Sequence, residues 1–169
     1  MGGLGTPRYT RERRCRWAQI SSAHRVHFSV ANTHADIVVS AQEHIYLGHE
    51  QKVLMRSDIV LRRAGRVMTI ADCKYKRLEA DEFKNHDVYQ MLAYCTAMRA
   101  ERGLLIYPVH TVDLNDAVRV RHMSVTIRHM TIDLAKTGHE LVQECGAFVA
   151  RVCAWLESDD APSVPLTIV

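Results

Sequence analysis

Two apolar runs near the middle of the chain, 53–61 and 67–75, are joined by a short polar stretch that contains Gly65. Both runs are rich in β-branched residues, which favour strands, and a glycine between two such runs favours a tight turn. The pattern predicts two antiparallel strands connected as a hairpin. The chain must then fold around a sheet that contains this hairpin.

Charged residues interrupt these runs, and among them are two aspartates and a lysine: Asp58, Asp72 and Lys74. A buried charge is costly unless it is paired or bound to a metal. Asp72 and Lys74 share one face of their strand, and a hairpin about Gly65 can bring Asp58 beside them. Two carboxylates are suitable ligands for Mg²⁺ or Mn²⁺, and a lysine can stabilise charge on a phosphate. We therefore expect a metal-dependent phosphodiesterase site; the alternative is a solvated hairpin face, because Asp-x-Lys alone is common.

The segments around the hairpin predict an α/β fold with a mixed central sheet flanked by helices. The further expected strands are 35–40 with 44–47, 104–108, and one or two within 118–132. The expected helices are 85–101 and 136–157. Asn85 is a suitable N-cap for the first helix, and Gly103 is expected to stop it. The stretch 76–84 is expected to be a polar connection.

The helix expected at 85–101 carries Gln90 and Tyr94 four residues apart, so both lie on one face. That face differs from the apolar stripe expected to point to the core, which is Val88, Met91, Leu92, Cys95 and Met98. An amide and a phenol presented together could hold a DNA phosphate, a base or the catalytic carboxylates. The alternative is an ordinary boundary between an apolar and a polar helix face.

The positive charge of the chain is concentrated at its N-terminus. Residues 1–30 hold six arginines and one glutamate, a charge of +5, so the rest carries −2 of the net +3. The basic balance therefore gives no evidence that the rest binds nucleic acid. We expect a basic, disordered segment at 1–33, one domain at 34–158 and a tail at 159–169. No apolar run approaches the roughly 20 residues that cross a bilayer, and no signal sequence is evident, which predicts a cytoplasmic protein.

The cysteines and histidines show no spacing typical of a metal or disulfide site. None of the five cysteines forms a CxxC pair, and Cys95, Cys145 and Cys153 are expected to pack as small apolar residues in helices. His122 and His129 alternate with apolar residues, which favours positions on the surface of the sheet. Structural zinc is therefore not expected.

In combination, Asp58, Asp72-Cys-Lys74 and Gln90-Met-Leu-Ala-Tyr94 resemble the PD-(D/E)xK nuclease superfamily, in the branch with a QxxxY helix. The longer strings are similar to the McrC family of nuclease subunits from McrBC modified-cytosine restriction systems. These strings are RSDIVL, IADCKYK, DVYQMLAYC and GLLIYP. The resemblance is clear over residues 50–110 and weaker over 34–158.

The resemblance implies a restriction-endonuclease-like fold and a Mg²⁺-dependent (or Mn²⁺-dependent) deoxyribonuclease. It implies an endonuclease subunit that cleaves modified-cytosine DNA together with an AAA+ GTPase of the McrB type. Carried over by position, Asp58 and Asp72 are metal ligands and Lys74 is the catalytic lysine. Gln90 and Tyr94 become the auxiliary or DNA-contacting pair on the helix.

The chain departs from the family pattern in two places. Ser57 stands where a proline usually precedes the first aspartate, which is expected to affect only the entry to the strand. Residues 1–33 lack the acidic helix and the partner-docking domain that family members carry, so we expect an N-terminally truncated relative. The alternatives are an inactive or partnerless nuclease-fold fragment and a stand-alone RecB-like or Cas4-like exonuclease. The Cas4 type usually needs cysteines for an iron–sulfur cluster, which the spacing of Cys145 and Cys153 does not supply.

Overall fold

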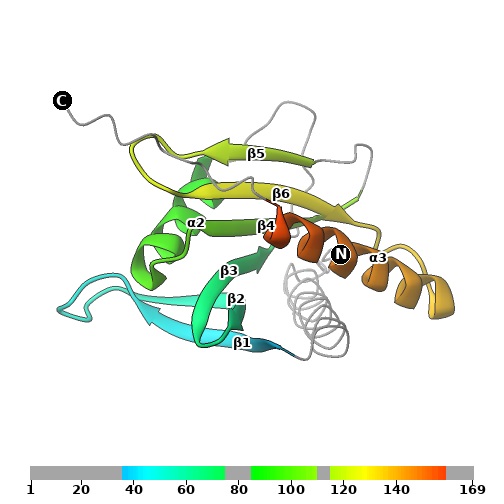
Figure 1. The fold of residues 1–169 in the computed structure, drawn as a ribbon, viewed down its shortest axis with the longest axis horizontal. Helices are drawn as coiled ribbons and strands as arrows, with labels where there is room; N and C mark the ends of the chain where they lie inside the picture. Colours follow the sequence, from blue (N-terminus) through cyan, green and yellow to red (C-terminus); the bar gives the residue numbers. More distant parts are fainter. Residues whose placement is uncertain (1–35, 75–84, 110–114, 159–169) are drawn as a thin grey trace, which may run out of the picture.

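The computed structural model describes residues 36–74, 85–109 and 115–158. In these residues the chain forms a mixed sheet with a helix on each face (Figure 1). The strands are β1 (Ile37–Tyr46), β2 (Leu54–Arg63), β3 (Arg66–Cys73), β4 (Arg102–Pro108), β5 (Asn115–Arg119) and β6 (Thr126–Ile132). The helices are α2 (Asn85–Met98) and α3 (Gly138–Glu157). The expected α/β class is confirmed.

The hairpin expected about Gly65 is formed by β2 and β3. Arg63 pairs with Arg66 across a two-residue turn. Ala64 and Gly65 both have positive φ angles, 50° and 77°, as a turn that matches the twist of an antiparallel pair requires. The hairpin register continues to the pair Ile59 and Ala71.

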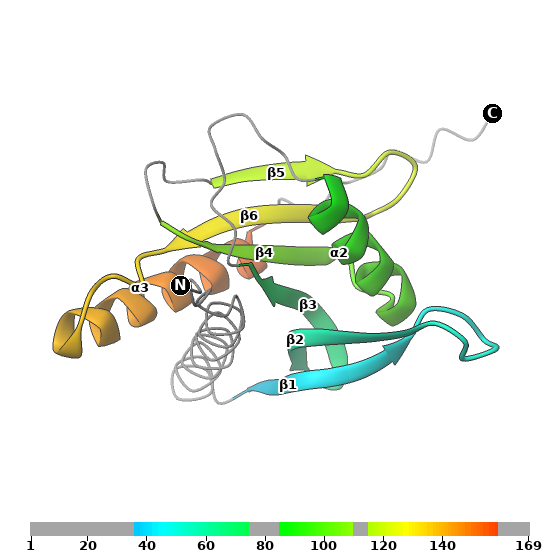
Figure 2. The ribbon, with the colours of Figure 1, turned by 180° about the vertical axis from the view of Figure 1, so that it is seen from behind.

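The strand order β1-β2-β3-β4-β6-β5 places the parallel strands β3, β4 and β6 together and the antiparallel strands on either side. Helix α2 connects β3 to β4 over one face, and α3 covers the other face (Figure 2). Side chains that alternate along the central strands therefore enter two separate cores. Asp72 and Lys74 are two and four residues after Ile70, so they lie on the same face of the sheet as Ile70, which packs in the core beneath α2.

Helix α2 ends earlier than the sequence suggested, at Met98. Arg99 has a φ of 54° and takes the left-handed position that usually ends a helix. Gly103, the expected stop, lies instead inside β4. A Cβ atom there would lie 2.5 Å from Cγ of Met91, so the glycine allows α2 to approach the sheet closely.

Strand β1 joins the two segments expected at 35–40 and 44–47. Its irregularity lies at Gln42, which has a φ of 55° yet leaves the pairing with β2 in register. The region 118–132, expected to hold one or two strands, contains all of β6 and only the last two residues of β5. The prediction that His129 lies on the surface was wrong, because this side chain is only 4% exposed. Both sheet faces are covered, so alternation alone could not separate outside from inside.

His122 is exposed, but it lies in the turn between β5 and β6 rather than on the sheet. The three cysteines expected in the core, Cys95, Cys145 and Cys153, are buried free thiols. Neither α2 nor α3 is long and apolar enough to cross a membrane. The basic segment 1–33, the connection 76–84 and the tail 159–169 lie outside the described residues.

Candidate active site

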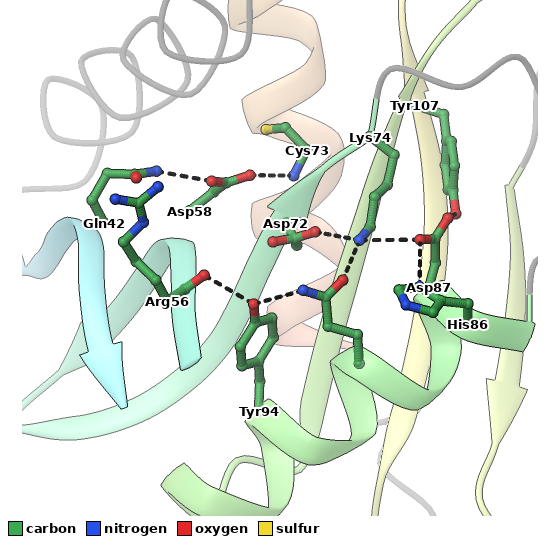
Figure 3. A network of polar contacts seen from close by, with 11 residues as sticks. Gln42, Arg56, Asp58, Asp72, Cys73, Lys74, His86, Asp87, Tyr94 and Tyr107 are labelled. Atoms are coloured by element: carbon green, nitrogen blue, oxygen red, sulfur yellow. Dashed lines mark hydrogen bonds and ion pairs between the residues drawn. The ribbon is translucent and has the colours of Figure 1, made fainter. Parts of the chain in front are cut away.

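The two aspartates lie where the hairpin ladder ends. The last paired residues are Ile59 and Ala71; Asp58 directly precedes Ile59 on β2, and Asp72 directly follows Ala71 on β3. Beyond this point Oδ2 of Asp58 accepts a hydrogen bond from the backbone N–H of Cys73 at 2.9 Å (Figure 3). A carboxylate thus replaces the next ladder contact between β2 and β3. On its other side β3 stays paired with β4, through Cys73 and Ile106.

Lys74 follows directly and turns its ammonium back into the site. Its Nζ lies 2.6 Å from Oδ2 of Asp72 and 3.2 Å from Oδ1 of Asp87. It also donates to Oε1 of Gln90 at 2.6 Å. Figure 3 shows the ammonium between the carboxylates of Asp72 and Asp87. The sequence placed Asp72 and Lys74 on one face, and this part of the prediction is confirmed.

Two side chains of α2, Gln90 and Tyr94, connect Lys74 to strand β2 through hydrogen bonds. Nε2 of Gln90 donates to the hydroxyl of Tyr94 at 2.9 Å, and that hydroxyl donates to the carbonyl of Arg56 at 2.9 Å. The expectation that Gln90 and Tyr94 face the acidic cluster is therefore confirmed. The expectation that Tyr94 lies apart from the core was wrong, since the residue is 2% exposed and belongs to the same buried cluster as Met91. A tyrosine is long enough to bury its ring and still present its hydroxyl.

Three site residues were not identified from the sequence. Asp87 lies in the first turn of α2, where an acidic residue favours a helix, and it also contacts Lys74. It is three residues before Gln90, and this helical spacing is a signal that could have placed it on the same face.

Gln42 lies opposite Asp58 in the register of β1 and β2 and donates to its Oδ1 at 2.8 Å. Tyr107 of β4 donates to Oδ2 of Asp87 at 3.1 Å. The positions of Gln42 and Tyr107 depend on strand pairing, which short sequence patterns do not reveal.

Comparison with known families bears directly on this arrangement. The family model described as the McrBC 5-methylcytosine restriction system component matches residues 25–108, which contain all the residues of the site named above. The chain belongs to the McrBC family. This confirms, at the level of the family, the resemblance carried by the motifs around Asp58, Asp72 and Gln90.

A solved structure shows the same fold. It is described as the refined half-complex from a tetradecameric assembly of Thermococcus gammatolerans McrB AAA+ hexamers with bound McrC. The match has a TM-score of 0.58 at 11% sequence identity, and it covers 73% of this chain. It covers 30% of the matched chain, so this McrBC-family chain spans less than a third of that length. No curated protein matches the sequence.

Burial and repulsion act together on the acidic group of this McrBC-family site. Asp72 is 6% exposed, and its burial, together with the neighbouring charges of Asp58 and Asp87, raises its pKa from 3.8 to about 6 despite the opposing ion pair with Lys74. Burial opposes the charged form of Lys74, but Asp72 and Asp87 outweigh it, so the pKa of Lys74 is raised. Burial and the charge of Asp72 raise the pKa of Tyr94 to about 12, so it keeps its proton at neutral pH.

The donor set is compatible with one divalent cation. Asp72 and Asp87 contact the ammonium of Lys74, and Asp58 lies close enough to raise the pKa of Asp72, so these four groups carry a formal charge of −2 when all are ionised. Mg²⁺ is commonly held by one or two carboxylates and retains several waters. Within the described ranges, no group of three or more His, Cys, Asp or Glu side chains is placed to hold a metal. Asp58 and Asp72 are the pair predicted from the sequence as ligands, and Asp87 lies on the far side of Lys74 from Asp72 (Figure 3).

Proposed function

We propose that this chain is a Mg²⁺-dependent deoxyribonuclease subunit of a modified-cytosine restriction system. It would cleave phosphodiester bonds in DNA, in the cytoplasm, as an endonuclease. The observation that supports this best is the convergence of Asp72, Lys74 and Gln90 in one network, with Asp58 held against the adjoining backbone. The site therefore contains residues from all three motifs that resemble the PD-(D/E)xK superfamily: the first aspartate, the Asp-x-Lys strand and the QxxxY helix.

Each residue has a role that its position allows. Asp58 and Asp72 would hold Mg²⁺ or Mn²⁺, and Gln42 with the Cys73 amide fixes the orientation of the Asp58 carboxylate. The metal, when bound, supplies an activated water and neutralises charge on the phosphate. Lys74 supplies a positive charge for the phosphate in the transition state. The Gln90–Tyr94 pair restrains Lys74 from the helix side.

The proposed partner is an AAA+ GTPase of the McrB type. Two findings support it: the family is that of a restriction system component, and the matched structure contains McrB AAA+ hexamers with bound McrC. The sequence itself has no GxxxxGK[ST] phosphate-binding motif, so nucleotide hydrolysis is assigned to the partner. The DNA substrate would carry a modified cytosine, which the partner recognises.

A cleavage assay tests the proposal. The purified chain would be mixed with a McrB-type GTPase, GTP, Mg²⁺ and DNA that either contains or lacks 5-methylcytosine. Internal cleavage of the modified DNA is expected, and Asp58→Ala, Asp72→Ala and Lys74→Ala should each abolish it. Calorimetry should show that the aspartate variants lose Mg²⁺ affinity and that Lys74→Ala keeps it, because a lysine binds no metal. Asp133→Ala, which alters an aspartate beyond the end of β6, is the matched control and should cleave normally.

The alternatives predict different results. Metal binding without cleavage under any condition would favour an inactive nuclease-fold fragment. Degradation from DNA ends without the GTPase would favour a stand-alone exonuclease. If the wild type bound no divalent metal and the aspartate variants cleaved as well as the wild type, the assignment of the active site would be wrong.

A further inference from the structure

We propose that Asp87 is a positioning residue that holds the ammonium of Lys74 in place beside Asp72. This inference rests on the proposed nuclease function and adds to it a residue that the motifs do not include. Each carboxylate oxygen of Asp87 has its own contact inside the site, and Oδ1 also lies 3.6 Å from Nδ1 of the exposed His86. Oδ1 lies 3.2 Å from Nζ of Lys74, and Oδ2 accepts the hydrogen bond from Tyr107 at 3.1 Å.

The burial of Asp87 indicates a role beyond helix stabilisation. An acidic residue in the first turn favours a helix through the dipole, and it does so while exposed to water. Glu140 occupies the same turn of α3 and is exposed. Asp87 is only 3% exposed, so its carboxylate loses most of its hydration. The contacts with Lys74 and Tyr107 compensate for that loss.

Tyr107 fixes the carboxylate from the sheet side. The residue is 2% exposed and packs in the core beneath α2, so its hydroxyl has little freedom to move. The pKa of Tyr107 is raised by burial and by the nearby charge of Asp87, so the hydroxyl remains a donor at neutral pH. Figure 3 shows the resulting chain of contacts from Tyr107 through Asp87 to Lys74.

The position of Asp87 matters because Asp72 has a second task. Asp72 is also a proposed metal ligand, and a bound metal would compete with the Lys74 ammonium for its carboxylate oxygens. Other groups must therefore help to hold Lys74. Asp87 and Gln90 also contact Nζ and would keep it in place. Loss of Asp87 would therefore misplace the ammonium without removing a metal ligand.

The test combines kinetics with a spectroscopic measurement on the full chain. Asp87→Asn is nearly the same size as the native residue; it removes the charge and replaces one acceptor oxygen with an amide donor. We expect kcat to fall about tenfold to a hundredfold, as for a misplaced catalytic group, with KM and Mg²⁺ affinity changed by no more than about twofold. The ¹⁵N-edited signal of the Lys74 ammonium, assigned by its loss in Lys74→Arg, should be visible in the wild type and broadened in Asp87→Asn. Glu140→Gln is the matched control and should leave both measurements unchanged.

A second variant addresses the possibility that Asp87→Asn disturbs folding. Tyr107→Phe keeps the ring in the core and removes only the hydroxyl, so it should broaden the same signal and lower kcat by a smaller factor. An unchanged Lys74 signal in both variants would overturn the positioning role, even if cleavage falls. If the wild type does not cleave at all, the proposed function fails, whereas the ammonium signal still decides whether Asp87 holds Lys74.

Discussion

Replacement of Asp72 by asparagine should stabilise the metal-free protein while it destroys cleavage. The carboxylate lies under α2, where burial and the charges of Asp58 and Asp87 raise its pKa from 3.8 to about 6. The ion pair with Lys74 opposes this rise without cancelling it. Asparagine resembles the neutral carboxyl form, so the substitution removes the destabilising charge.

The size of the effect follows from the two pKa values. Each pKa unit corresponds to about 1.4 kcal/mol, so ionised Asp72 reduces the free energy of unfolding by about 3 kcal/mol at most. Because the folded pKa is above the unfolded value, this loss is complete above about pH 6, shrinks as the pH falls, and is absent below 3.8. At pH 5 about half of it should remain.

Urea denaturation in EDTA at pH 7.5 and pH 5 measures this directly. The stability gap between Asp72→Asn and the wild type should be about twice as large at pH 7.5 as at pH 5. Asp36→Asn is the matched control: Asp36 is exposed and ion-paired with Arg63, so its loss should change stability by about 1 kcal/mol or less. A variant that is less stable than the wild type at pH 7.5, or a gap that is equal at both pH values, would refute the reasoning.

Three further predictions concern packing, hydrogen bonding and metal. Gly103→Ala should destabilise the fold by about 1–3 kcal/mol, because its Cβ would lie 2.5 Å from Cγ of the buried Met91. Gly146 is the contrasting position on α3, because nothing lies within 4 Å of a Cβ atom placed there. Gly146→Ala should raise the free energy of unfolding by about 0.5–1 kcal/mol in the same urea assay. Tyr94→Phe should lower stability by about 1–2 kcal/mol, equally at pH 7 and pH 9 because the pKa of the phenol is about 12. Added Mg²⁺ should raise the Tm of the wild type in calorimetry but not that of Asp72→Asn, and equal increases would contradict the ligand assignment.

Local patterns predicted the elements of this fold well. Period-two alternation and the turn at Gly65 identified β2 and β3, and helical spacing identified α2 and α3. Such patterns depend on contacts between near neighbours in the chain, which the sequence displays directly. The end of α2 was misjudged because Arg99, a residue that rarely adopts positive φ, stops the helix and Gly103 serves packing instead.

The parts of the site that were missed depend on long-range pairing. Gln42 meets Asp58 only through the register of β1 on β2, and Tyr107 meets Asp87 only because β4 lies beside β3. His129 was placed on the surface because alternation does not show that a helix covers the second face of the sheet. Only Asp87 had a local signal, its spacing of three from Gln90.

The site forms where the sheet changes its pairing, and this explains its composition. Past Ala71, strand β3 loses its hydrogen bonds to β2 and keeps those to β4. The freed amide of Cys73 needs an acceptor, and Asp58 supplies one. Buried polar groups without partners are costly, so an opening in a sheet must be filled by side chains that can hydrogen-bond. Here carboxylates fill the opening, and one ammonium leaves their negative charge only partly balanced. The same feature that weakens the hairpin ladder thus creates the unbalanced charge that a divalent cation would neutralise.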